Sequence, residues 1–210
     1  MATRRVILVF CSIASLIACC VLLIGCATSS ASINTYVDPG FDGSTLQRLA
    51  IFPIRNTRLA PSEAQQLNRD LSQAINNRKP SMAIVSSAEA IQVLNDSGLA
   101  DEWARFLDNY NSSGIPNASV LRDIGHVLGV DAVIQGEIVN IQQSDGVYGG
   151  NKGTTRVTVR YSMMGVQSGK LLWEASSDGL RTTATTLESA PPVIEAVQLA
   201  QQKILATLPF

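Results

Sequence analysis

The chain has 210 residues, of which 46% are hydrophobic and 16% charged, and its formal net charge is −1. This length suits one medium domain or two small ones. No basic run occurs beyond the first few residues. A nucleic-acid-binding protein needs clustered Lys and Arg, so the composition argues against that class.

The N-terminus has the layout of a secretory signal. Arg4 and Arg5 are followed by residues 6–24, which carry no charge, and then by Gly25 and Cys26. The aliphatic pair before Gly25-Cys26 resembles the lipobox of bacterial lipoproteins. We therefore predict that residues 1–25 are removed and that Cys26 carries an S-diacylglycerol and an N-acyl group. The alternative is an uncleaved anchor helix, because residues 6–24 could just span a bilayer.

Cysteine usage agrees with export. All four cysteines lie in the signal or at its end, at positions 11, 19, 20 and 26. The mature chain therefore has no disulfide, and its one thiol would be blocked by lipid. Loss of Arg4 and Arg5 leaves 14 basic and 17 acidic residues.

Residues 27–35 are mostly small and polar, and the segment continues through Pro39-Gly40 and Gly43 to about Thr45. This composition predicts a flexible tether behind the lipidated Cys26, with an average span of about 25 Å. A single domain is expected over 46–210, so it should lie close to its membrane.

The predicted elements follow in chain order. An apolar run at 49–54 predicts a buried strand, and Pro53 suggests that this strand lies near an edge of the sheet or an irregularity. A helical stripe runs from Ser62 to Pro80, and a short strand is expected at 83–85. Three further helices are expected after Ser86, over about 99–110, and over 118–128.

The remainder is rich in strands. Residues 131–142, 157–163 and a segment starting at 171 have strand patterns, and the pair Ser168-Gly169 signals a hairpin turn. A final helix is expected over 193–205. The order predicts an α/β (α+β) sandwich, with a mixed β-sheet that ends in an antiparallel meander and is flanked by helices.

Four segments carry a resemblance to a known family: 50–56, 84–87, 128–138 and 166–174. They resemble the "Pro-Phe-x-Asn", second-strand, "Gly-Val-Asp" and "Gly-x-x-x-Trp" motifs of the periplasmic lipoprotein superfamily that includes the curli-secretion protein CsgG, the penicillin-binding-protein activator LpoB and the N-terminal domain of TolB. The resemblance covers about residues 46–206. It implies a non-catalytic adaptor or assembly domain held at the outer membrane, facing the periplasm.

Candidate chemical groups are few. His126 is the only histidine, and without a second His or a Cys it suits the polar face of a helix better than a metal site. Asp101 and Glu102 are adjacent, which suits a helix N-terminus rather than an acid–base pair. Residues 146–153 are rich in glycine but lack the spacing of a phosphate loop. We expect a flexible hairpin loop there, with Tyr148 as a candidate partner contact.

These features lead us to expect no enzyme, no metal and no cofactor other than the covalent lipid. The leading hypothesis is a lipid-anchored adaptor that binds another, unidentified envelope protein, with a homo-oligomer left open. The alternatives are a subunit of a secretion channel and an activator of a peptidoglycan synthase. Ala27 follows Cys26 where an Asp would resemble an inner-membrane retention signal, so the resemblance favours the outer membrane.

Overall fold

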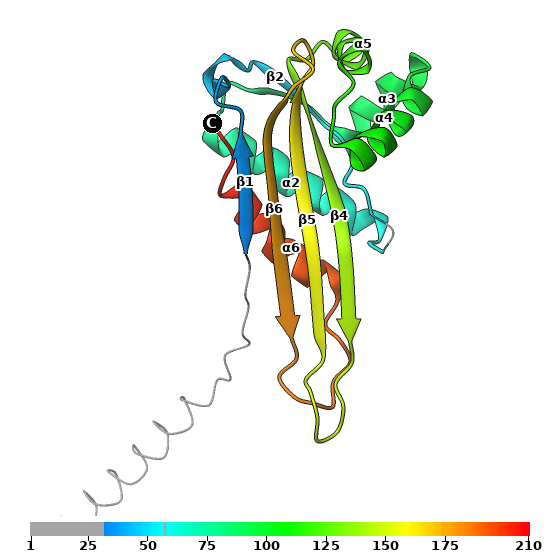
Figure 1. Cartoon of the computed structure of the whole chain (residues 1–210), viewed down its shortest axis with the longest axis vertical. Helices are drawn as coiled ribbons and strands as arrows, with labels where there is room; N and C mark the ends of the chain where they lie inside the picture. The colour runs from blue at the N-terminus through cyan, green and yellow to red at the C-terminus, as the bar shows by residue number, and fades with distance from the viewer. Residues whose placement is uncertain (1–31, 57) are drawn as a thin grey trace, which may run out of the picture.

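The computed structural model describes residues 32–56 and 58–210. The predicted signal peptide, Gly25 and Cys26 lie outside these described residues. The described chain is built on one mixed sheet in the strand order β1-β6-β5-β4-β2-β3 (Figure 1). The strands are β1 Ile33–Val37, β2 Arg48–Ile51, β3 Ala83–Val85, β4 Ala132–Ser144, β5 Thr154–Gly165 and β6 Leu171–Thr182.

Parallel and antiparallel pairing meet at β4. Strand β2 runs parallel to both β3 and β4, whereas β4, β5 and β6 form an antiparallel meander. The predicted fold class is therefore confirmed, including the meander. Strand β2 lies inside the sheet, between β4 and β3, and it ends at Ile51, so Pro53 marks an irregularity rather than an edge.

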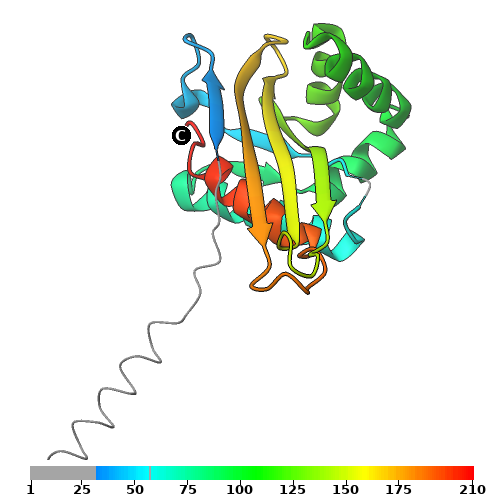
Figure 2. The ribbon, with the colours of Figure 1, turned by 60° about the horizontal axis from the view of Figure 1, so that its bottom comes forward.

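Within the described residues, five α-helices cover the sheet on its two faces (Figures 1 and 2). They are α2 Pro61–Arg78, α3 Ser87–Asp96, α4 Ala100–Ser113, α5 Ala118–Leu128 and α6 Val193–Leu205. Helices α2 and α6 pack on one face, and α3, α4 and α5 pack on the other. Among the described residues, none of these helices is long and apolar enough to cross a membrane.

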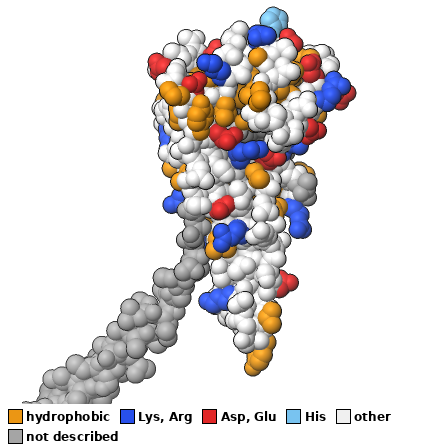
Figure 3. Space-filling view, in the orientation of Figure 1, with side chains coloured by type: hydrophobic (Ala, Val, Ile, Leu, Met, Phe, Trp, Pro, Cys, Tyr) orange, Lys and Arg blue, Asp and Glu red, His pale blue; other side chains and the backbone are white. Residues whose placement is uncertain are grey.

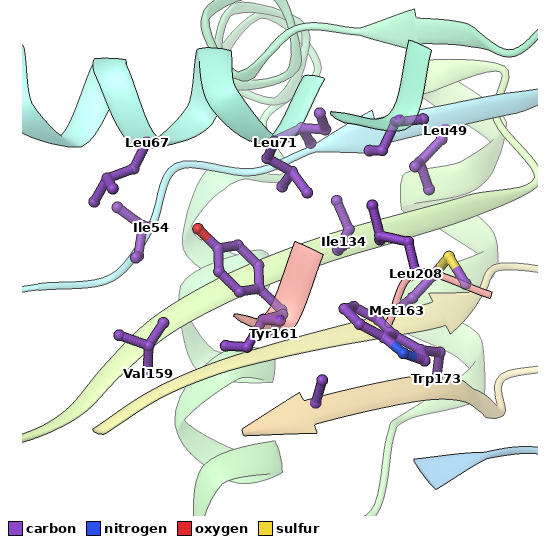
Figure 4. Packing of buried hydrophobic residues seen from close by; sticks show 14 of the residues in the cluster. Leu49, Ile54, Leu67, Leu71, Ile134, Val159, Tyr161, Met163, Trp173 and Leu208 are labelled. Atoms are coloured by element: carbon purple, nitrogen blue, oxygen red, sulfur yellow. The ribbon is translucent and has the colours of Figure 1, made fainter. Parts of the chain in front are cut away.

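The larger core cluster lies between the sheet and the pair α2 and α6 (Figure 4). Tyr161 and Trp173 are its two largest fully buried side chains. Their polar atoms are satisfied: Gln201 donates to the Tyr161 hydroxyl at 2.9 Å, and the Trp173 indole donates to the Thr207 carbonyl at 3.1 Å. Burial raises the pKa of Tyr161 far above its usual value.

Three residues of the resemblance motifs have structural roles. The Asp131 carboxylate accepts the backbone N–H groups of Gln47 and Arg48, both at 2.8 Å, and so joins the starts of β4 and β2. Asn56 accepts the Leu59 N–H at 2.9 Å in the turn before α2. Trp173 is in the core. These three residues stabilise the fold, which explains why they occur in the motifs. A functional site must therefore be sought among other residues, on the surface.

The predicted tether is wrong from residue 33 onward. Residues 33–37 form β1, which pairs antiparallel with β6 in the register Ile33↔Ser177 to Val37↔Trp173. A short 3-10 helix, η1 Gly43–Thr45, follows, and Asp42 caps it by accepting the Ser44 N–H. The physical reason is that β6 would otherwise be an unpaired edge of the sheet, and β1 satisfies its backbone groups.

Candidate functional site

The chain joins the sheet within six residues of Cys26. The Ser32 carbonyl accepts the Asp178 N–H at 3.1 Å and the Ser177 hydroxyl at 2.8 Å. Gly25 and Cys26 themselves lie outside the described residues, so their processing stays a prediction. What changes is the length of chain between the predicted lipid and the folded domain, which falls from about 20 residues to about six.

Tyr148 lies in the turn between β4 and β5, and 86% of its side chain is exposed. The predicted loop between two strands is confirmed, and it lies at the lower end of the sheet in Figure 1. The Val147 N–H donates to the Asn151 carbonyl at 3.0 Å, and the Gly150 N–H donates to the Val147 carbonyl at 2.8 Å. The two arms therefore stay paired beyond the ends of the strands.

The segment between β6 and α6 lies against this turn. The Gly146 N–H donates to the Glu188 carbonyl at 3.1 Å, and the Ala190 N–H donates to the Asp145 carboxylate at 2.8 Å. A Cβ on Gly146 would lie 2.6 Å from the carbonyl oxygen of Thr186, which is closer than real Cβ contacts. The glycine thus serves the close approach of two backbones, which explains a glycine-rich sequence without any phosphate.

A cleft opens between α4 and the middle of the sheet. Its volume is about 640 Å³, and its walls come from the segment after β2, from α4 and from β4. Trp103, Ile54 and Ile138 contribute apolar surface. Arg55 and Asp108 form an ion pair of 3.0 Å at the rim. Such a mixture of apolar wall and charged rim suits the side chains of another protein.

A polar network lies beside the cleft. Arg160 donates to Glu137 at 2.8 Å and to Asn111 at 3.0 Å, and Asn111 donates to the other Glu137 oxygen at 3.0 Å. The three side chains close a triangle that links α4, β4 and β5. Because the three hydrogen bonds join side chains from α4, β4 and β5, the network holds α4 on the sheet at the border of the cleft.

A second set of hydrogen-bonded side chains lies between α4 and the sheet. Tyr110 and Ser162 both donate to the same Glu174 oxygen, at 3.2 Å and 2.7 Å. Burial is the main cause that raises the pKa of Tyr110, so its hydroxyl stays protonated and available as a donor. The chemistry here is that of hydrogen bonding between packed elements.

The other residues considered in the sequence lie on helix surfaces. His126 is exposed in the last turn of α5, as expected for the polar face of a helix. Asp101 and Glu102 lie in the first turn of α4, where their charges favour the helix N-terminus. Within residues 32–56 and 58–210, no three His, Cys, Asp or Glu side chains gather as metal ligands do.

Sequence reasoning missed the cleft and the polar network. Arg55 and Asp108 are 53 positions apart, and Arg160 and Asn111 are 49 apart. Only the parallel pairing of β2 with β4 and the packing of α4 bring them together. The sequence carries no local signal for such contacts, because each residue on its own looks like an ordinary surface charge or amide.

Comparisons with known proteins give fold-level similarity alone. No family model matches the sequence, and no curated protein matches it. Solved structures that resemble it include PelC from Paraburkholderia phytofirmans, described as a dodecamer, with 14% identity, a TM-score of 0.47, and coverage of 84% of this chain and 96% of that chain.

Two further solved structures also resemble this chain. Lipoprotein GNA1162 from Neisseria meningitidis matches with 15% identity, a TM-score of 0.47, and coverage of 77% of this chain and 99% of that chain. The LpoB C-terminal domain from Escherichia coli matches with 19% identity, a TM-score of 0.40, and coverage of 69% and 90%. LpoB is one of the proteins behind the sequence resemblance. At this level of similarity, no partner or activity passes from these proteins to this chain.

Proposed function

We propose that this chain is a non-catalytic lipoprotein, anchored through Cys26 and facing the periplasm from the outer membrane, that binds another envelope protein. The proposal is carried by the short length of chain between the lipobox and the first residue of the folded domain. The predicted lipidated Cys26 precedes Ser32 by six residues, and Ser32 is already hydrogen-bonded to β6. A domain joined to its lipid in this way is held against the membrane surface.

The short junction also bears on the alternatives. Six residues reach about 20 Å at full extension, whereas the tether expected from the sequence would have reached about 70 Å. That limits how far the domain could extend to a synthase across the periplasm. For a channel, residues 98–116 would have to refold as a membrane hairpin, but they contain α4, whose Trp103 and Phe106 are buried in the core.

The cleft beside α4 is the surface we assign to the partner. It combines apolar side chains with the Arg55–Asp108 ion pair, and its walls are fixed by the polar network next to it. Arg, Trp and other aromatic residues contribute most to the binding energy of protein interfaces, and Trp103 and Arg55 both line the cleft. A partner that inserts an apolar side chain here would bury it next to Trp103.

Anchoring is tested with Cys26→Ser. We expect wild-type protein in the outer-membrane fraction with acyl label, and the variant folded but unlabelled and unprocessed. If the variant still carries acyl label at its processed N-terminus, or if wild-type protein lacks it, the anchoring proposal is wrong. Recovery of wild-type protein in the inner-membrane fraction would contradict the assigned location.

Partner binding is tested by crosslinking in the native host, followed by affinity purification of the tagged protein. We expect one envelope protein to be recovered with wild-type protein and lost with Asp108→Lys, which places a second positive charge next to Arg55. Asp123→Lys is the matched control, because Asp123 is exposed on α5 and does not line the cleft. Equal recovery with both variants would remove the cleft from the proposal.

A further inference from the structure

Apolar side chains gather at one end of the molecule. Of the large hydrophobic side chains exposed in the described residues, the four most exposed are Tyr148 (86%), Ile115 (74%), Leu187 (70%) and Val147 (62%). Three of these four lie in two segments, the turn between β4 and β5 and the segment between β6 and α6. Figure 3 shows apolar side chains at the lower tip, below a largely polar stretch of the sheet face.

This tip has a fixed shape. The two segments are tied by hydrogen bonds from Gly146 to Glu188 and from Thr183 to Gly153, the latter at 2.9 Å. The Thr155 hydroxyl and the Gln143 amide both donate to the Pro191 carbonyl, at 2.5 and 3.2 Å. The exposed apolar side chains are therefore presented by a braced end of the sheet.

The register of the sheet gives the positions of the anchor and of the tip along the strand direction. Ser32 lies beside Ser177 and Asp178, and β6 ends at Thr182, which pairs with Thr154 at the lower edge of the sheet. Ser32 is thus four residues, or about 13 Å, above that edge. A fully extended segment from Ser32 back to Cys26 measures about 20 Å. Cys26 can therefore lie at most about 7 Å beyond the edge.

The tip extends beyond the lower edge of the sheet about as far as Cys26 can. Ser144 and Thr154 end the paired strands, and the hydrogen bond from Val147 to Asn151 shows that the arms continue for three more residues. Three residues of extended chain add about 10 Å, so Tyr148 lies about as far from the edge as Cys26 can reach. When the acyl chains on Cys26 are in the bilayer and the strands stand on the membrane, the tip meets the headgroup region.

The chemistry of the tip suits that environment. Residues 145–153 carry Asp145 and Lys152, and residues 183–190 carry Glu188, so the net charge of the two segments of the tip is −1. An apolar tip without a charge cluster binds a lipid surface by burial rather than by attraction to anionic lipid. Tyrosine is favoured at membrane interfaces because its ring is apolar and its hydroxyl stays hydrated.

From this geometry we infer a second membrane contact, in which Val147 and Tyr148 at the tip, with Leu187 beside them, insert into the lipid interface next to the Cys26 anchor. The inference rests on the proposed lipid anchoring. It fixes the orientation of the domain, with the tip toward the bilayer and α5 away from it. The Arg55–Asp108 cleft then lies above the membrane, open to the periplasm.

The test uses Tyr148→Trp in the full, lipidated protein, reconstituted into phosphatidylethanolamine–phosphatidylglycerol vesicles. The two native tryptophans, Trp103 and Trp173, are buried and give a constant background. We expect the emission of the introduced indole to shift to shorter wavelength and to be lost when lipids brominated near the headgroup are included. Ile115→Trp is the matched control: Ile115 is also highly exposed, but it lies between α4 and α5, at the upper end. Its emission should stay unchanged.

The outcomes separate the two proposals. If mass spectrometry of the vesicle-bound protein finds no acyl group on Cys26, the anchoring proposal fails before fluorescence is measured. If acylated protein is bound to the vesicles but brominated lipid does not affect Tyr148→Trp, the tip contact is wrong and the anchoring proposal stands. Equal quenching of Tyr148→Trp and Ile115→Trp would overturn the assigned orientation. Shielding of the Tyr148→Trp indole only by an envelope protein would make the tip a protein contact and overturn the inference.

Discussion

The two ends of the meander are buried in different ways. At the upper end of β5, residues 161–165 are all buried, because α6 and α2 cover one face and α4 and α5 cover the other. At the lower end, burial along β5 alternates, and the last part of β4 is mostly exposed. The upper end therefore supplies stability, and the lower end is a thin projection that can present a surface.

The largest expected effect is in the covered end. Trp173→Ala would remove a fully buried indole and leave the Thr207 carbonyl without its donor, which should cost about 3–5 kcal/mol of unfolding free energy. Urea unfolding monitored by circular dichroism measures this. Tyr148→Ala, at the projecting tip, is the control and should change stability by no more than about 0.5 kcal/mol. Similar losses for both variants would contradict the division.

The next effect is confined to the lower end. Gly146→Ala would press a Cβ against the backbone of Thr186, and such overpacking costs about 1–3 kcal/mol. We expect faster hydrogen exchange in residues 145–153 and 183–190, with little change in the covered end. Gly150→Ala is the matched control, since its Cβ would meet nothing closer than 3.4 Å. Unchanged exchange in Gly146→Ala would show that the brace between the two segments is unimportant.

Alkaline pH should weaken the covered end through Tyr161. Its pKa is raised in the folded protein, so above pH 10, the ordinary value, the unfolded chain loses this proton first. The contribution of Tyr161 to the free energy of unfolding is therefore complete below pH 10. Above pH 10 the free energy of unfolding falls by up to about 1.4 kcal/mol per pH unit for this group. Urea unfolding at several pH values tests it, with Tyr161→Phe as the control, in which the slope should be smaller. An equal slope in both proteins would argue against this role for Tyr161.

The smallest effect concerns the border between the two ends. A double-mutant cycle with Arg160→Met and Glu137→Gln should give a coupling energy of about 1 kcal/mol in unfolding, because the pair is partly shielded from solvent. A value near zero would mean that the network at the cleft is not a structural link. The coupling should weaken only modestly in high salt, since screening acts mainly on exposed charges.

Much of the fold could be predicted from the sequence. The stripes of α2, α4 and α5 are strongly periodic, and the predicted positions of β3 and of the meander agree with the structure, because apolar residues in these segments recur with helical or strand spacing. Strand β1 was missed because all five of its residues are exposed, so no alternation marks it. It exists only because the edge of β6 needs a partner, and that is a property of the assembled sheet.

Less of the candidate site than of the fold could be predicted from the sequence. Tyr148 could be singled out because an aromatic residue in a glycine-rich loop is conspicuous. Arg55, Asp108 and the polar network could not, because their proximity depends on strand register and on the packing of α4. The relation between the tip and Cys26 also depended on β1, since a tether of 20 residues would have left the orientation of the domain undefined.

Anchoring at Cys26 is the claim on which the orientation of the molecule depends. Mass spectrometry of the N-terminal peptide of protein purified from membranes of the native host tests it most directly. We predict a peptide that begins at Cys26 and carries a diacylglyceryl group together with an amide-linked acyl chain. A peptide that begins before Cys26, or an unmodified Cys26, would contradict the account.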